Sequence, residues 1–262
     1  MLKFRYIFLF LLFAVDGLMA QDSSKLSKTS AGLRNSVLFC FNYGRQVPVG
    51  LLSNRFGGSN TVGFSTAYKF GNNFQVQAGI NALFSGKVKE NGIFDTMVGG
   101  SGYLVDVNGN LAEIKMYERG LTWHVDFGKV IPINKFDVNS GILLTAGAGF
   151  MQHYIKYTFQ RTVLPQLEGE YAKGYDRLTN GLMLRGFAGY QKIDPKAMLN
   201  FVVGIEVLNG FTKNRRAFNY DTRTADNTSR NDLMIGLKVG VMISISGRKA
   251  GASKGDEERY FD

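Results

Sequence analysis

The chain has 262 residues and a formal net charge of +10, and 45% of its residues are hydrophobic. That hydrophobic share excludes a disordered chain, and the single cysteine, Cys40, excludes a disulfide scaffold. Only one apolar run approaches the length of a membrane helix, so a bundle of transmembrane helices is excluded too. The 32 glycines, 21 phenylalanines and 12 tyrosines are typical of a membrane β-barrel or of a soluble β-rich protein.

The N-terminus has the three parts of a secretory signal peptide. Lys3 and Arg5 are basic, residues 6–15 are almost all apolar, and Ala20 supplies a small residue before the expected cleavage site. The apolar run is shorter than the roughly 20 residues that a membrane helix needs. We therefore expect residues 1–20 to be a signal peptide and the protein to be exported.

The rest of the chain alternates between runs of period two and breaks rich in Gly and Asn. One face of each run is apolar, and the other face is polar or small. The eight expected strands are 36–43, 61–70, 74–84, 120–131, 138–150, 181–191, 200–211 and 232–246.

The connections distinguish a barrel from a soluble sandwich, which alternation alone does not. Three connections are tight, at 71–73, 134–137 and 194–196, and four are long, at 44–60, 85–119, 152–178 and 212–231. Long and short connections alternate strictly, as in an outer-membrane barrel with short periplasmic turns and long extracellular loops. The sequence thus favours an all-β fold, an eight-stranded antiparallel up-and-down transmembrane barrel, in the bacterial outer membrane.

This topology predicts a domain organisation. Residues 21–34 are expected to be a periplasmic N-terminal segment, 35–246 the barrel, and 247–262 a periplasmic tail. Aromatic residues near the expected strand ends predict interfacial girdles, with ordinary core packing as the alternative. They are Tyr43, Tyr68, Phe70, Phe74, Tyr190, Phe201 and Phe211.

Charged residues on the inward faces predict a network in the lumen, which side chains just fill in an eight-stranded barrel. Its members are Asp126, Arg185, Glu206 and Lys238. A symmetric turn at 194–197 would place Arg185 directly opposite Glu206. We expect a structural ion pair there, with a gate or proton path as the alternative.

Residues for catalysis are few. His124 is expected to face inward, and His153 is expected to be a hydrogen-bonded residue just beyond the membrane part of its strand. No motif with metal-ligand spacing occurs, so we expect no metal site, no cofactor and no enzymatic activity. A small barrel enzyme that uses His153 remains a minor alternative. Cys40 is interpreted as a small packed thiol.

Two basic segments are candidates for binding. The loop at 212–231 combines basic and aromatic residues and could contact lipopolysaccharide or a protein, whereas nucleic acid is a poor partner outside the cell. Its candidate residues are Lys213, Arg215, Arg216, Phe218, Tyr220 and Arg223. The tail ends in Arg259, Tyr260 and Phe261, which we interpret as a docking peptide, with a disordered end as the alternative.

Seven stretches within residues 34–246 resemble a known family. They are 55–57 (RFG), 118–120 (ERG), 139–142 (NSGI), 147–153 (GAGFMQH), 173–180 (KGYDRLTN), 211–221 (FTKNRRAFNYD) and 230–236 (RNDLMIG). Together they resemble the small outer-membrane barrels of Bacteroidota that belong to the type IX secretion and gliding machinery, of the PorG type or its PorT-type sisters. The resemblance implies a role beside a periplasmic ring of PorK-like and PorN-like proteins, which the tail could reach.

Two functional hypotheses follow. The first is a non-enzymatic barrel that anchors or organises the type IX secretion machinery. The second is a stand-alone structural or adhesive barrel of the OmpA type that acts through its extracellular loops.

Overall fold

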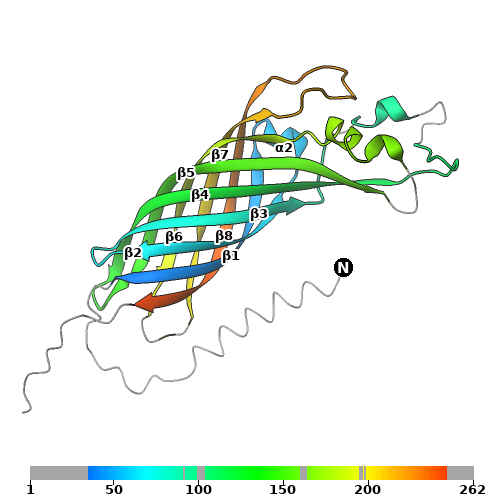
Figure 1. Cartoon of the computed structure of the whole chain (residues 1–262). Coiled ribbons are helices and arrows are strands. Elements are labelled where there is room, and N and C mark those ends of the chain that lie inside the picture. Colours follow the sequence, from blue (N-terminus) through cyan, green and yellow to red (C-terminus); the bar gives the residue numbers. More distant parts are fainter. Residues whose placement is uncertain are drawn as a thin grey trace, which may run out of the picture. The chain divides into compact units, whose positions relative to one another are not determined.

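In this computed structural model, the described residues are 35–90, 92–98, 104–159, 164–194, 197 and 199–246. Within them, eight antiparallel strands close into a barrel in which each strand pairs with the next and β1 pairs with β8 (Figure 1). The strands are β1 (Ser36–Val49), β2 (Ser59–Lys69), β3 (Phe74–Ser85), β4 (Ile114–Asn134), β5 (Asp137–Phe159), β6 (Thr179–Lys192), β7 (Asn200–Asn214) and β8 (Ser229–Ser246).

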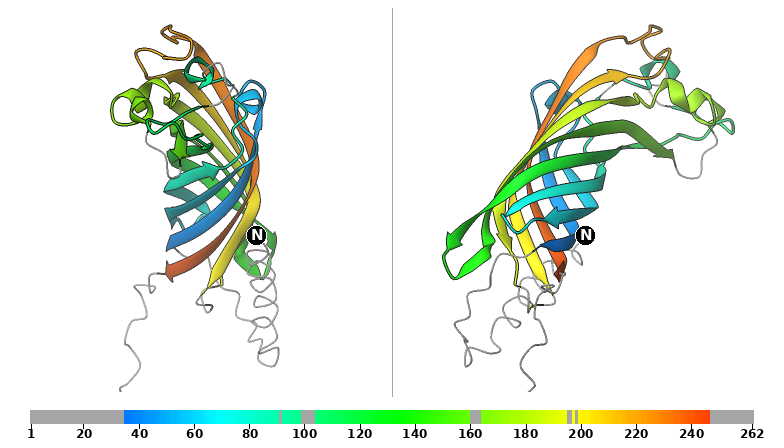
Figure 2. Two further views of the ribbon diagram at one scale, coloured as in Figure 1. Left: turned by 90° about the vertical axis from the view of Figure 1, so that its right-hand side faces the viewer. Right: turned by 60° about the vertical axis from the view of Figure 1, so that its left-hand side comes forward.

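The predicted fold class is therefore confirmed, but several boundaries were wrong. At the end of the barrel that carries the long loops, every strand begins or ends beyond the predicted position, and β4 and β5 reach furthest (Figure 2). The four long loops shrink to 50–58, 86–113, 160–178 and 215–228. Pairing continues there because the loops pack onto the extended strands.

The opposite end carries the three short connections, and we call it the turn end. Asn73 adopts a φ of 67° between β2 and β3, a conformation that asparagine tolerates better than most residues. Asn134 accepts a hydrogen bond from the backbone N–H of Phe136 in the β4–β5 turn. The third connection runs from 193 to 199 and is longer than predicted, because Ile193 folds into the barrel end and bonds to the Ser140 hydroxyl.

Short helices lie only among the loops in the described part of the chain. They are α2 (Leu52–Arg55), η1 (Asp95–Met97), η2 (Pro165–Leu167) and η3 (Tyr171–Gly174). The described helices include none with the length and apolar character needed to cross a membrane.

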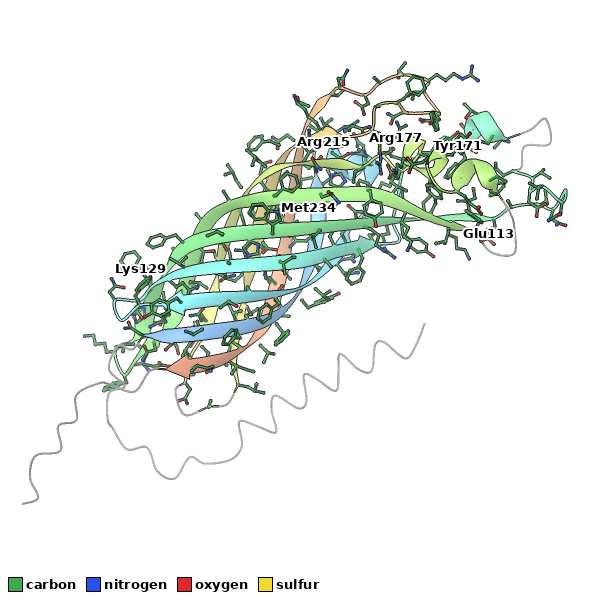
Figure 3. The ribbon with its side chains drawn as sticks, viewed as in Figure 1. Glu113, Lys129, Tyr171, Arg177, Arg215 and Met234 are labelled. Carbon is green, nitrogen blue, oxygen red and sulfur yellow. The ribbon has the colours of Figure 1, made fainter. Side chains whose placement is uncertain are left out.

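The outer wall of the barrel carries an apolar belt. Alternate residues of every strand point outward, and the belt includes Phe41, Val62, Ile80, Trp123, Leu144, Leu184, Ile205 and Leu237, all of them exposed. Polar residues interrupt the outer wall near the loop end, where Arg45 pairs with Asn60 and Asn180 pairs with Lys213. Lys129 lies outward near the turn end, opposite the end where Arg177 and Arg215 lie (Figure 3). The belt is the part of the wall that suits contact with lipid.

Candidate functional site

The middle of the lumen holds four charged side chains, which we call the lumen charge cluster. Asp126, Arg185, Glu206 and Lys238 come from β4, β6, β7 and β8, and each is at most 5% exposed. They point inward because they occupy the strand positions that alternate with the belt residues. The structure thus places together the four residues that were predicted to form a network in the lumen.

Arg185 is the centre of this cluster. Its Nε and Nη2 lie 2.8 and 2.7 Å from Glu206 Oε1, and its Nη1 pairs with Asp126. Lys238 Nζ lies 3.0 Å from the same Glu206 oxygen, while Gln46 Nε2 donates to the other oxygen at 2.6 Å. The formal charges of the two acidic and the two basic side chains therefore cancel in the middle of the lumen.

The register between β6 and β7 differs from the prediction by two residues. Arg185 faces Leu208 and Glu206 faces Phe187, so the two charges are diagonal neighbours, not direct partners. The predicted register was wrong because the β6–β7 pairing is centred between residues 196 and 197, one residue further along the chain than the turn assumed at 194–197. The ion pair still forms, since a long arginine reaches its diagonal neighbour across a strand pair.

His124 lies beside the cluster, 2% exposed, with its Nε2 3.6 Å from Asp126 Oδ2. Gly79 on β3 leaves room for the ring, because a Cβ at Gly79 would lie 2.7 Å from His124 Nε2. Cys40 is also buried and points inward from β1.

Apolar side chains occupy the lumen on both sides of the charge cluster, among buried polar ones such as Gln75 and Glu118. Towards the turn end they include Leu38, Val130, Leu143, Phe187 and Met242, and towards the loop end Leu83, Met151, Met183, Leu208 and Met234. A cavity between Arg185 and Phe187 measures about 30 Å³, enough for one or two water molecules. The interior is therefore a packed core of apolar and polar side chains.

The four loops pack into a single layer over the loop end, which we call the loop cap. It comprises the described residues of 50–58, 86–113, 164–178 and 215–228. Its apolar core continues the upper lumen and includes Leu52, Phe56, Ile93, Leu164, Leu167 and Tyr175.

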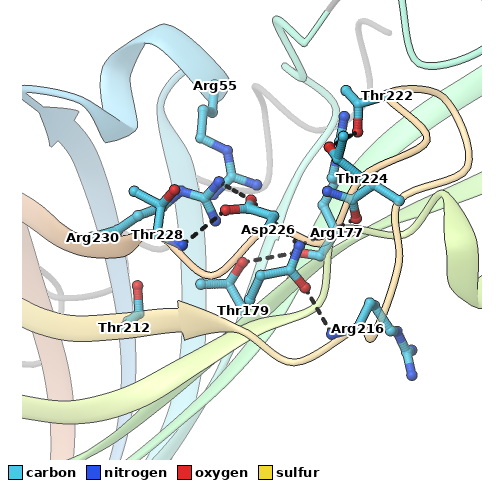
Figure 4. A network of polar contacts seen from close by, with 12 residues as sticks. Arg55, Arg177, Thr179, Thr212, Arg216, Thr222, Thr224, Asp226, Thr228 and Arg230 are labelled. Carbon is cyan, nitrogen blue, oxygen red and sulfur yellow. Dashed lines mark hydrogen bonds and ion pairs between the residues drawn. The ribbon is translucent and has the colours of Figure 1, made fainter.

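Arginine–carboxylate pairs join loops that are far apart in the sequence. Arg177 Nε lies 3.4 Å from Glu90 Oε2, and Arg177 also pairs with Asp221, while Arg55 pairs with Glu90. These contacts connect all four loops. Further pairs join Arg216 to Asp176 and Arg230 to Asp226 in the region shown in Figure 4.

Hydrogen bonds hold these loop charges in their ionised forms. Although partial burial opposes ionisation, bonds from the Thr228 backbone and from Arg230 lower the pKa of Asp226 to about 2. The Asp176 carboxylate raises the pKa of Arg216. Because the pKa of Asp226 is lower in the folded loop, its contribution is complete above the ordinary aspartate range and is lost as the pH falls towards 2.

Phe56 closes the lumen from above. Its side chain is fully buried, its ring meets the edge of His153 at 5.5 Å, and the Arg55 guanidinium lies 5.2 Å from its centre. His153 Nε2 lies 2.9 Å from Asp232 Oδ2, and Thr212 donates to the same oxygen. His153 is therefore a buried and hydrogen-bonded residue, as expected, and it lies within β5, which continues past the predicted end at residue 150.

The sequence pattern does not predict the contact of Asp232 with His153 or that of Glu118 with Ser59. Glu118 is buried beside Ser59, whose hydroxyl donates to it. A strand pattern shows that both acids point inward, but it cannot show which neighbour across the barrel each one meets.

The candidate loop residues divide into two groups. Arg216, Phe218 and Tyr220 are used within the cap, since Arg216 pairs with Asp176 and Tyr220 contacts both Phe218 and Tyr175. Lys213 and Arg223 are exposed, whereas Arg215 bonds to the amide oxygen of Asn180. The predicted docking residues Arg259, Tyr260 and Phe261 lie outside the described residues, as do the signal peptide, residues 21–34 and the tail.

We expect the variant Arg177→Gln to loosen the loop cap without unfolding the barrel. It removes two partly buried ion pairs at once, each of a kind that typically contributes about 1 kcal/mol. Limited trypsin digestion of the folded protein should then cleave the loops several times faster. The control is Arg223→Gln, at an exposed arginine of the neighbouring loop. Equal digestion rates for both variants would contradict a bridging role for Arg177.

Among the described residues, no group of three or more His, Cys, Asp or Glu side chains could hold a metal ion. The barrel has an apolar belt on its outer wall, paired charges in its lumen, and a loop cap joined by ion pairs at one end. A closed antiparallel barrel with these features is a transmembrane barrel of the bacterial outer membrane, with its turn end in the periplasm and its cap outside.

No protein-family model matches the chain, and no curated protein matches it. Solved structures of similar architecture include Ail, the attachment invasion locus protein of Yersinia pestis, at 12% identity and a TM-score of 0.41, covering 80% of this chain and 99% of Ail. A major outer membrane protein from Thermus thermophilus has 10% identity, a TM-score of 0.41 and coverages of 80% and 99%. The N-terminal barrel domain of Pseudomonas aeruginosa OprF has 12% identity, a TM-score of 0.36 and coverages of 80% and 98%. Structural similarities at these identities and TM-scores are not used to infer the function of this protein.

Proposed function

We propose that this protein is a non-enzymatic and non-conducting outer-membrane barrel that anchors a partner assembly. The single observation that supports this is the filled lumen. The charge cluster around Arg185 occupies its middle, apolar and polar side chains together fill both halves, and Phe56 lies across its outer end. A packed interior gives solutes no path, but it gives a rigid body that holds surfaces in fixed positions on either side of the membrane.

The finer proposal is that the assembly is the type IX secretion machinery. Its support is the sequence resemblance, together with where the resembling stretches lie. Six of the seven contribute to one place, the junction of the loop cap and the upper lumen. The contributing residues are Arg55, Glu118, His153, Arg177, Asp221 and Asp232. Similar residues that gather in one region of the structure support a family resemblance better than scattered similarities do.

Gene deletion with complementation tests the proposal. A deletion strain should lose secretion of type IX cargo and gliding, and a plasmid carrying the whole chain should restore both. A plasmid that lacks residues 247–262 separates a periplasmic docking role of the tail from a role of the barrel itself.

The alternative, a structural or adhesive barrel that acts through its loops, predicts a different result. Secretion would stay normal in the deletion strain, and shortening the loop at 215–228 would change surface binding. Normal cargo secretion would therefore exclude the type IX role. The protein would then act through its extracellular loops.

A further inference from the structure

Basic side chains at the loop end of the belt differ in their pairing from those in the loop cap. In the cap, Arg55, Arg177, Arg216 and Arg230 all meet carboxylates. At the edge of the belt, Arg45, Arg119, Lys213 and Arg215 have no carboxylate within ion-pair distance among the described residues. We call these four the belt-edge cations.

Uncharged groups hold the belt-edge arginines in place. Arg45 donates to the Asn60 amide oxygen at 2.9 Å, and Arg215 donates to the Asn180 amide oxygen. Arg119 donates to the backbone oxygens of Glu118 and Ser85, at 2.8 and 3.4 Å, and lies 5.1 Å from the centre of the Tyr117 ring. These contacts orient the guanidinium groups, and none of the three has a carboxylate within ion-pair distance among the described residues.

Beside Arg119 the outer wall is hollowed into a groove across β3, β4 and β5. Two rows of cross-strand neighbours line it. The row nearer the membrane centre is Ala82, Leu121 and Gln152, and the row further out is Phe84, Arg119 and Tyr154. The small side chain of Ala82 between larger neighbours contributes to the hollow.

We propose that this groove binds a phosphorylated lipid of the outer leaflet. The phosphate group contacts the Arg119 guanidinium, and an acyl chain lies along Ala82 and Leu121 into the apolar belt. Charge complementarity supports this occupant, since an unpaired guanidinium at a membrane interface favours an anion and forms strong charge-assisted hydrogen bonds with phosphate. The groove also crosses the belt edge, so a ligand that fits must be charged at one end and apolar at the other.

The fluorescence of Trp123 can be used to measure lipid binding in the groove. It is the single tryptophan of the chain, and it lies on the outer face of β4, two residues from Leu121. The folded protein is placed in phosphatidylcholine vesicles, and brominated-chain phosphatidic acid is added to quench its fluorescence. Brominated-chain phosphatidylcholine serves as the uncharged comparison, and inorganic phosphate is added as a competitor.

In the wild-type protein we expect phosphatidic acid to quench at about tenfold lower mole fraction than phosphatidylcholine, as one charge-assisted contact allows. Arg119→Gln should abolish this preference, and Arg119→Lys should restore part of it. The matched control is Lys129→Gln, on the same face of β4 at the turn end, which should keep the preference.

A second variant tests the groove without touching the arginine. Ala82→Leu fills the hollow from the lipid side and should weaken quenching by phosphatidic acid. Equal quenching by both lipids in the wild type would overturn the proposal. So would equal losses in Arg119→Gln and Lys129→Gln, or full competition by inorganic phosphate, which would show a free-anion site.

Discussion

Replacing Arg185 with leucine is expected to lower the free energy of unfolding of the barrel by about 3–5 kcal/mol. The reason is the charge balance of the lumen. Without Arg185, Glu206 keeps Lys238 as a partner at 3.0 Å. Asp126 loses its guanidinium partner and is left as a buried carboxylate with the His124 ring 3.6 Å away. Urea unfolding in detergent micelles, followed by Trp123 fluorescence and by loss of the heat-resistant compact band on gels, measures the change.

A double variant separates charge from packing. Arg185→Leu combined with Asp126→Asn removes one charge of each sign and leaves the pair between Glu206 and Lys238 intact. It should recover more than half of the lost stability, because no unpaired ion remains buried. Arg223→Gln, far from the lumen, is the surface control. If the double variant is as unstable as the single one, the role of Arg185 is packing and not charge compensation.

Replacing Phe56 with alanine is expected to open the loop cap while leaving the barrel closed. Loss of a fully buried phenylalanine typically costs about 3–5 kcal/mol, and here the lost contacts are those to His153 and Arg55. Hydrogen exchange should therefore rise at the backbone amides of the cap, and much less at those of the strands below. Planar-bilayer conductance should stay at the wild-type baseline, because the lumen charge cluster still fills the barrel.

The neighbouring residue Leu51 offers a matched control for Phe56. It is 66% exposed, so Leu51→Ala removes a side chain of the same loop without leaving a cavity. Its exchange pattern should equal that of the wild type. A rise in exchange along the strands of Phe56→Ala, or ion conductance through it, would show that Phe56 supports the barrel itself and not only the cap.

The local pattern of the sequence determined the strands and their faces. Alternation with period two predicts which residues point outward, because successive side chains of a strand lie on opposite sides of the sheet. Asp126, Arg185, Glu206 and Lys238 could be assigned to the lumen on that basis alone. The alternation of long and short connections then separated the barrel from a sandwich, because all short turns of an up-and-down barrel lie at one end.

Only the tertiary structure decided which residues meet. Arg185 pairs diagonally with Glu206 because the β6–β7 pairing is centred one residue beyond the turn assumed at 194–197. Arg177 meets Glu90 and Asp221 from two other loops, and His153 meets Asp232 across the barrel. Such contacts depend on register, shear and loop packing, which arise from the closure of the whole sheet. A periodic pattern fixes the side to which a residue points, but its neighbours are determined by strands distant in the sequence.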